Sequence, residues 1–242
     1  MNTRAIKFCL VFIVLLFSFS SCDNNGGSDP AVENGEILDL VISTLKKLTV
    51  EIDQEDIEML QESGLSLNIS IKVNGNFNVV WFSNANYLLN NEYEWSPNFE
   101  VYGSNVFETG AAVEIETNTL NVELGQEVIL NPLGVLENSM ESAPSDSISF
   151  VNNFGPIYPG MSQQIIPPDG MESILPSFVS PDLNNLETEL LTSMNEVMLW
   201  FGEMETGTIF SKVPINSFVV DLTDIEEATA LYSNGEWSIK GM

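Results

Sequence analysis

The sequence predicts a mainly β fold, an antiparallel β-sandwich-like domain with a few helices. From residue 65 onward, several segments alternate apolar and polar residues with a period of two, as expected for strands with one buried face. Two pairs of such segments are joined by Asn-Gly, the strongest short hairpin signal. Many short antiparallel strands joined in this way are typical of a β-sandwich.

Two helices are predicted before the first strands. The second runs from Gln54 to Glu62, with Asp53 as its N-cap and Gly64 just past its end. An alternative interpretation places a short strand at residues 50–52, between the two helices. The first helix is indicated by a three-to-four spacing of apolar residues at Ile37, Leu38, Val41, Ile42 and Leu45.

Two hairpins are predicted from alternation and turn residues. Residues 67–73 alternate, Asn74-Gly75 turns the chain, and residues 77–82 return. Near the C-terminus, residues 228–232 and 236–239 flank the turn Ser233-Asn234-Gly235. Further strands are expected at 128–130, 148–151 and 218–222.

A third ribbon is predicted over residues 113–124, with its turn at Thr117-Asn118-Thr119. In this pairing Glu114, Glu116 and Glu123 point away from the core on one face. Such carboxylates could bind Ca²⁺, or act as acid and base on a glycosidic bond. A solvated acidic face is the alternative explanation.

Residues 131–181 are rich in proline, glycine and serine and predict long ordered loops with a short strand or two, where a pocket could lie. Residues 183–201 have the apolar spacing of a helix, although 197–201 is also compatible with a buried strand. We predict a helix for this segment.

The first 21 residues have the pattern of a secretory signal peptide. Arg4 and Lys7 precede an apolar run at 8–17, which is too short to span a bilayer, and small residues lead to Cys22. The stretch Phe19-Ser20-Ser21-Cys22 resembles a bacterial lipobox, which implies cleavage before Cys22 and acylation of that cysteine.

Residues 22–35 are polar and glycine-rich, as in a flexible tether. They look similar to the start of lipoproteins from Bacteroidetes-type bacteria. The resemblance implies a lipid-anchored protein of the outer membrane, displayed at the cell surface. Residues 36–242 are expected to form one β-rich domain.

The composition removes several kinds of chemistry. From Cys22 onward the chain has five lysines and 35 acidic residues, a formal charge of 5 − 35 = −30, and no histidine or arginine. Histidine-based triads, His-ligated metals and thiol catalysis beyond Cys22 are therefore excluded. Nucleic acid is not a predicted partner, because phosphate binding depends on Lys and Arg. The charge permits Ca²⁺ binding or serves solubility in salt.

An aromatic segment supplies the candidate ligand site. Seven aromatic residues lie within residues 81–102, interspersed with asparagines. Tyr93 and Trp95 are two apart and would share one face of a strand. Flat rings beside amides are typical of sugar-binding sites, whereas burial in the core is the alternative. The predicted ligand-binding residues are Tyr93, Trp95, Trp81 and Asn91.

These features favour a non-catalytic, lipid-anchored envelope protein that binds an extracellular glycan or a partner protein. Such a protein needs no cofactor beyond the possible Ca²⁺. A carboxylate-dependent polysaccharide hydrolase and a purely structural envelope component are the alternatives. The glycan hypothesis predicts that Trp95→Ala weakens binding without unfolding the domain.

Overall fold

The computed structural model describes residues 45–182 and 184–241. The predicted signal peptide, Cys22, the predicted tether and nearly all of the helix predicted at 37–45 lie outside these residues. Within the described part of the chain, no helix is long and apolar enough to cross a membrane.

One sheet joins strands from both ends of the described chain. Its order is β17-β16-β1-β4, and β1 runs parallel to β16 with Val50 opposite Ala230. β4 is antiparallel to β1, and β17 is antiparallel to β16. The strands are β1 (Lys46–Ile52), β4 (Asn90–Trp95), β16 (Glu227–Ser233) and β17 (Glu236–Ile239).

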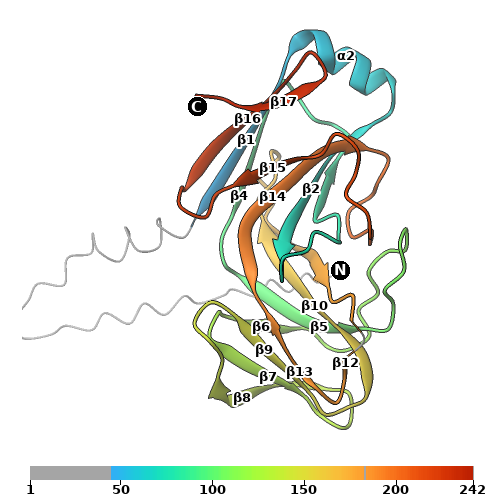
Figure 1. The fold of residues 1–242 in the computed structure, drawn as a ribbon, viewed down its shortest axis with the longest axis vertical. Helices are drawn as coiled ribbons and strands as arrows, with labels where there is room; N and C mark the ends of the chain where they lie inside the picture. Colours follow the sequence, from blue (N-terminus) through green and yellow to red (C-terminus); the bar gives the residue numbers. More distant parts are fainter. Residues whose placement is uncertain (1–44, 183, 242) are drawn as a thin grey trace, which may run out of the picture.

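A second sheet, of order β15-β14-β2-β3, is antiparallel throughout and faces the first across a shared core. The helix α2 (Gln54–Glu62) buries Ile57 and Leu60 in the same core. We call these two sheets and α2 the upper sandwich, which occupies the upper part of Figure 1. The strands of the second sheet are β2 (Ser66–Val73), β3 (Phe82–Asn84), β14 (Ser193–Gly202) and β15 (Phe218–Asp221).

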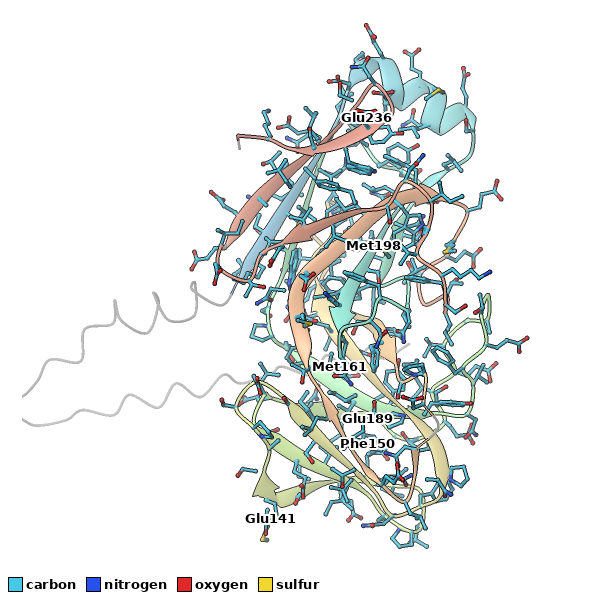
Figure 2. The ribbon with its side chains drawn as sticks, in the orientation of Figure 1. Glu141, Phe150, Met161, Glu189, Met198 and Glu236 are labelled. Atoms are coloured by element: carbon cyan, nitrogen blue, oxygen red, sulfur yellow. The ribbon has the colours of Figure 1, made fainter. Side chains whose placement is uncertain are left out.

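The lower sandwich is built from the middle of the chain and consists of two further sheets around a second core (Figure 1). One has the order β11-β10-β5-β6, with the short β12 also paired to β10, and the other has the order β13-β9-β7-β8. Figure 2 shows Phe150 within this sandwich and Met198 within the upper one. The strands are β5 (Phe99–Ser104), β6 (Leu120–Val122), β7 (Gln126–Leu130), β8 (Leu136–Ser142), β9 (Ile148–Asn152), β10 (Pro156–Ile165), β11 (Ser173–Val179), β12 (Asn184–Asn185) and β13 (Thr188–Leu191).

The two sandwiches are joined by several crossings of the chain. β4 leads into β5 through residues 96–98, and β13 leads into β14 through Thr192. β10 extends upward, where Glu94 and Ile166 exchange backbone hydrogen bonds of 3.0 and 2.7 Å and Ile165 enters the upper core. These crossings place β4, β5, β10 and β14 side by side at the junction.

The mainly β prediction is confirmed, and so are several of its elements. α2 begins and ends where the sequence predicts, after Asp53 and before Gly64, which has a φ of 68°. β16 and β17 pair as predicted around Asn234 and Gly235, whose φ angles of 53° and 78° suit a two-residue hairpin turn. The expected strands at 128–130, 148–151 and 218–222 correspond to β7, β9 and β15.

The first hairpin is only partly as predicted. Asn74 and Gly75 make the turn, and the returning chain pairs with β2 at residues 82–84. Between these points the chain leaves β2, and Val80 exchanges backbone hydrogen bonds with Thr208 and Gly207 instead.

The helix predicted at 183–201 is wrong, because β13 and β14 occupy this segment. Val197 and Leu199 enter the upper core, while Met198 and Trp200 are buried with Val80 and Phe210 on the opposite face of the sheet. A strand buried on both faces has a continuous apolar run, which periodicity does not distinguish from a buried helix.

The prediction of long loops with a short strand or two at 131–181 is also wrong, since this region contains β8, β10 and β11 besides the expected β9. Two of its prolines occupy positions where a strand tolerates them. Pro156 is the first residue of β10, and Pro176 lies in the edge strand β11 at a shift in register.

Candidate binding site

The four predicted ligand-binding side chains lie inside the upper sandwich. Trp81, Tyr93 and Trp95 are part of its core, and Asn91 hydrogen-bonds to its backbone. Tyr93, Trp81 and Asn91 are fully buried, and Trp95 is 2% exposed. The rings of Trp81 and Trp95 meet edge to face with centroids 5.8 Å apart. Asn91 donates to Leu88 O at 2.6 Å and to Val50 O at 3.2 Å. The prediction of an exposed aromatic platform made by these residues is therefore wrong.

The burial of Tyr93 predicts a loss of stability at alkaline pH. Burial raises the pKa of Tyr93 from 10 to about 12, and a hydrogen bond from Asn84 lowers it slightly. A folded-state pKa above the unfolded value stabilises the fold below pH 10, and this contribution is lost between pH 10 and about 12. The full loss is about 3 kcal/mol.

Denaturant unfolding at a series of pH values between 8 and 12 measures this effect. We expect Tyr93→Phe to flatten part of the alkaline decline, while buried Tyr102, whose pKa is also raised by burial, sustains the rest. An unchanged slope in the variant would show that Tyr93 does not contribute.

The predicted carboxylate face does not form, because residues 113–116 do not pair with residues 120–124. β6 pairs with β5, and Val113 and Glu116 donate to Gly207 O and Gly103 O. Glu114, Glu116 and Glu123 are all exposed. Across residues 45–182 and 184–241, no group of three or more His, Cys, Asp or Glu side chains is placed to hold a metal ion.

The candidate binding site is a cavity at the junction of the two sandwiches, with a volume of about 260 Å³. We call it the junction cavity. One part of its lining is apolar and the other is polar. The apolar lining consists of Trp95, Pro97, Phe99 and Leu124, and the polar lining of Lys46, Gln163, Ser193 and Asn195.

A bulge in β14 places Asn195 at the junction cavity. Ser193 pairs with Val73 and Val197 pairs with Ile71, so that four steps along β14 match two along β2. The extra residues bend the strand at Asn195, which lines the cavity. Bulges of this kind commonly redirect a side chain next to a functional site.

Gln163 forms the fixed polar part of the cavity. Its side chain is 97% buried, accepts a hydrogen bond from Ser193 Oγ at 3.1 Å and donates to Ser96 O at 3.4 Å. Its backbone carbonyl accepts from Trp81 Nε1 at 3.1 Å. These bonds connect β10 with β14, with the β4–β5 connection at Ser96 and with Trp81.

The cavity is locally cationic in an acidic protein. Lys46 is paired with Trp95 at the ends of β1 and β4, and its ammonium donates to Ile225 O at 2.9 Å. The ammonium retains two further donors. The residues lining the cavity include no carboxylate. The lower sandwich beneath it, residues 99–191, has fourteen acidic residues and no basic residue.

One wall residue also has an unused donor. The indole nitrogen of Trp95 is buried without a hydrogen-bond partner among the described residues, whereas that of neighbouring Trp81 is satisfied. Buried donors are nearly always paired in native proteins, so an unpaired donor beside a cavity needs an explanation. An acceptor supplied from the cavity would satisfy it.

The other end of the aromatic segment opens into a separate surface groove of about 300 Å³. Phe82 and Leu88 line it with Asn84, Asn86 and Asp169. Two asparagines of the segment therefore lie at a groove, although none of the four predicted residues does. The groove serves below as the control site.

Sequence reasoning identified one residue of the junction cavity, Trp95, and missed its polar residues. Gln163 lies in a region predicted as loops, and Asn195 in a segment predicted as a helix. Their convergence depends on pairings between strands that are distant in sequence, as the bond between Ser193 and Gln163 shows. No local pattern carries that information.

Comparison of the chain with protein-family models, with curated proteins and with solved structures found no match to any of them.

Proposed function

We propose that this protein is a lipid-anchored envelope protein that binds a neutral saccharide in the junction cavity. The observation that carries the proposal is the composition of that cavity, in which Trp95 and Phe99 share the wall with Asn195, Ser193 and Lys46. Small-molecule sites typically combine an apolar, aromatic lining with a few placed polar groups. The anchor at Cys22 is part of the proposal and rests on the lipobox resemblance.

The size of the cavity suits a short stretch of sugar. At about 260 Å³ it is slightly smaller than the typical range for drug-sized ligands, which begins near 300 Å³. A pyranose presents an apolar C–H face and a rim of hydroxyls. The first matches Pro97 and Leu124, the apolar lining residues that are not buried, and the second matches the amides of Asn195 and Gln163 and the hydroxyl of Ser193.

The surrounding charge favours a neutral ligand over an acidic one. A polysaccharide long enough to leave the cavity runs past the lysine-free lower sandwich. Charges within roughly 8–10 Å interact appreciably at moderate salt, so an anionic polymer is repelled there. Lys46 then acts as a hydrogen-bond donor to sugar oxygens.

Binding without cleavage is proposed because the residues that line the cavity include no carboxylate. Hydrolysis by this composition would require a pair of Asp or Glu side chains flanking the scissile bond. Measurement of reducing ends separates the hydrolase alternative from the binding proposal. Stable co-purification with an envelope complex would instead support a structural role.

We expect Asn195→Ala to weaken saccharide binding roughly fivefold to tenfold, the value of one or two hydrogen bonds. The side chain of Asn195 makes no hydrogen bond to another described residue, so its removal leaves the fold intact. The test uses the protein from residue 22 onward with Cys22→Ser, incubated with insoluble neutral polysaccharides and with acidic ones such as alginate and pectate. Retained protein and released reducing ends are both measured.

Asn86→Ala is the matched control, because Asn86 lines the surface groove and not the junction cavity. The proposal predicts retention on a neutral polymer, lost in part by Asn195→Ala and unaffected by Asn86→Ala. Retention by no polymer, or equal retention by both variants and the parent, would refute it. Released sugar would establish a hydrolase instead.

A further inference from the structure

We propose a second binding site that takes a single aromatic ring carrying a hydrogen-bond donor, as in a phenol. It is a cavity of about 150 Å³ that we call the phenylalanine cavity. It shares no lining residue with the junction cavity, so this inference does not rest on the proposed function. Its walls include Phe77, Phe107, Phe210, Pro181, Asn78 and Ser211.

Each of the three rings is held by a neighbour that does not line the cavity. The ammonium of Lys72 lies 5.9 Å from the centroid of Phe77. Phe107 packs on Tyr158 at 5.9 Å, and Phe210 meets Trp200 edge to face at 5.5 Å. These contacts fix the rings before any ligand arrives, which lowers the entropic cost of binding.

The loops that carry Phe107 and Phe210 are tied to each other. Gly110 N donates to Ile209 O at 2.8 Å, and Ile209 N donates to Ala111 O at 2.8 Å. The hydroxyl of Thr109 donates to that of Ser211 at 2.8 Å. A bonded ribbon that links the two sandwiches therefore forms one side of the cavity.

Asn78 supplies the polar specificity. Its side chain is 5% exposed, and Nδ2 donates to Val179 O at 2.6 Å. This bond fixes the amide and leaves Oδ1 buried without a partner among the described residues. A buried acceptor without a donor is rare in native proteins. A ligand hydroxyl or N–H placed in the cavity would supply the donor.

The volume limits the ligand to one ring. Cavities of about 150 Å³ lined by aliphatic and aromatic side chains bind benzene. Three phenylalanines and a proline provide a comparable apolar lining here. The combination of an aromatic wall with one unused acceptor selects phenol over toluene chemistry.

Ligand-observed NMR titrations of the protein lacking its signal peptide, with Cys22→Ser, test this site with p-cresol and toluene. We expect p-cresol to bind roughly fivefold to tenfold more tightly than toluene, the contribution of one hydrogen bond. Phe107→Ala removes a wall and is expected to weaken p-cresol binding at least about tenfold. Phe154→Ala is the matched control, because Phe154 is 48% exposed and does not line the cavity.

A further variant and a further ligand refine the assignment. Asn78→Ala should abolish the preference for p-cresol over toluene. N-acetyl-tyrosinamide distinguishes the two sources of such a ring. If it binds with the same affinity as p-cresol, the natural ligand is a tyrosine side chain of a partner protein. If only p-cresol binds, the natural ligand is a free phenol. Failure of p-cresol to bind, unchanged binding in Phe107→Ala, or equal affinity for p-cresol and toluene would overturn the proposal.

Discussion

Replacing Trp95 with alanine is expected to lower the free energy of unfolding by about 3–5 kcal/mol, the usual cost of deleting a buried tryptophan. Trp95 is 2% exposed and packs edge to face on Trp81 in the upper core. Domains of this size are typically stable by about 5–15 kcal/mol, so a large part of the total is lost. The burial of Trp95 therefore corrects the expectation that Trp95→Ala weakens binding without unfolding the domain.

Denaturant unfolding of two conservative variants separates packing from hydrogen bonding. Trp95→Phe keeps a ring and removes an indole nitrogen that has no partner, so we expect a cost of less than about 1.5 kcal/mol. Trp81→Phe also removes the bond to Gln163 O, which adds about 0.5–1.5 kcal/mol. Equal stability of Trp95→Ala and the parent protein would contradict this account of the core.

Replacing Gly160 with alanine is expected to destabilise the protein by about 3 kcal/mol, at the upper end of typical overpacking costs. A Cβ at this position of β10 would overlap two carbons of the Tyr102 ring and lie 2.7 Å from Cδ2. The ring has no free direction in which to move, because it is fully buried and its hydroxyl donates to Phe178 O at 3.0 Å. The melting temperature should fall by about 6–12 °C.

A double-mutant cycle shows whether this cost comes from the ring. Gly160→Ala is expected to cost much less in a Tyr102→Leu background, because the smaller side chain leaves room for the added methyl group. Calorimetric melting of the four proteins gives the interaction energy. An undiminished cost in the Tyr102→Leu background would place the clash elsewhere.

Local patterns predicted those elements that one segment of chain determines. Alternation of apolar and polar residues identified β2, although its polar residues Asn68 and Ser70 are buried as well, and Asn234-Gly235 identified the β16–β17 hairpin. The N-cap at Asp53 and the glycine at residue 64 gave the ends of α2. In each case the signal and the structure lie within a dozen residues of each other.

Local sequence patterns do not predict which distant segments pair with each other. β1 pairs in parallel with β16 across some 180 residues, and β6 pairs with β5 although a local hairpin partner was available. β14 resembles a helix in sequence because both of its faces are buried. The junction cavity depends on these pairings, which explains why only Trp95 of its residues was anticipated.

A crystal structure of the protein with a bound neutral oligosaccharide tests the central claim most directly. The oligosaccharide is taken from the polymer that retains the protein best. We predict one sugar ring in the junction cavity, in contact with Pro97 or Leu124 and hydrogen-bonded to Asn195. Sugar bound instead in the surface groove at Phe82, or at neither place, would contradict the assignment of the site.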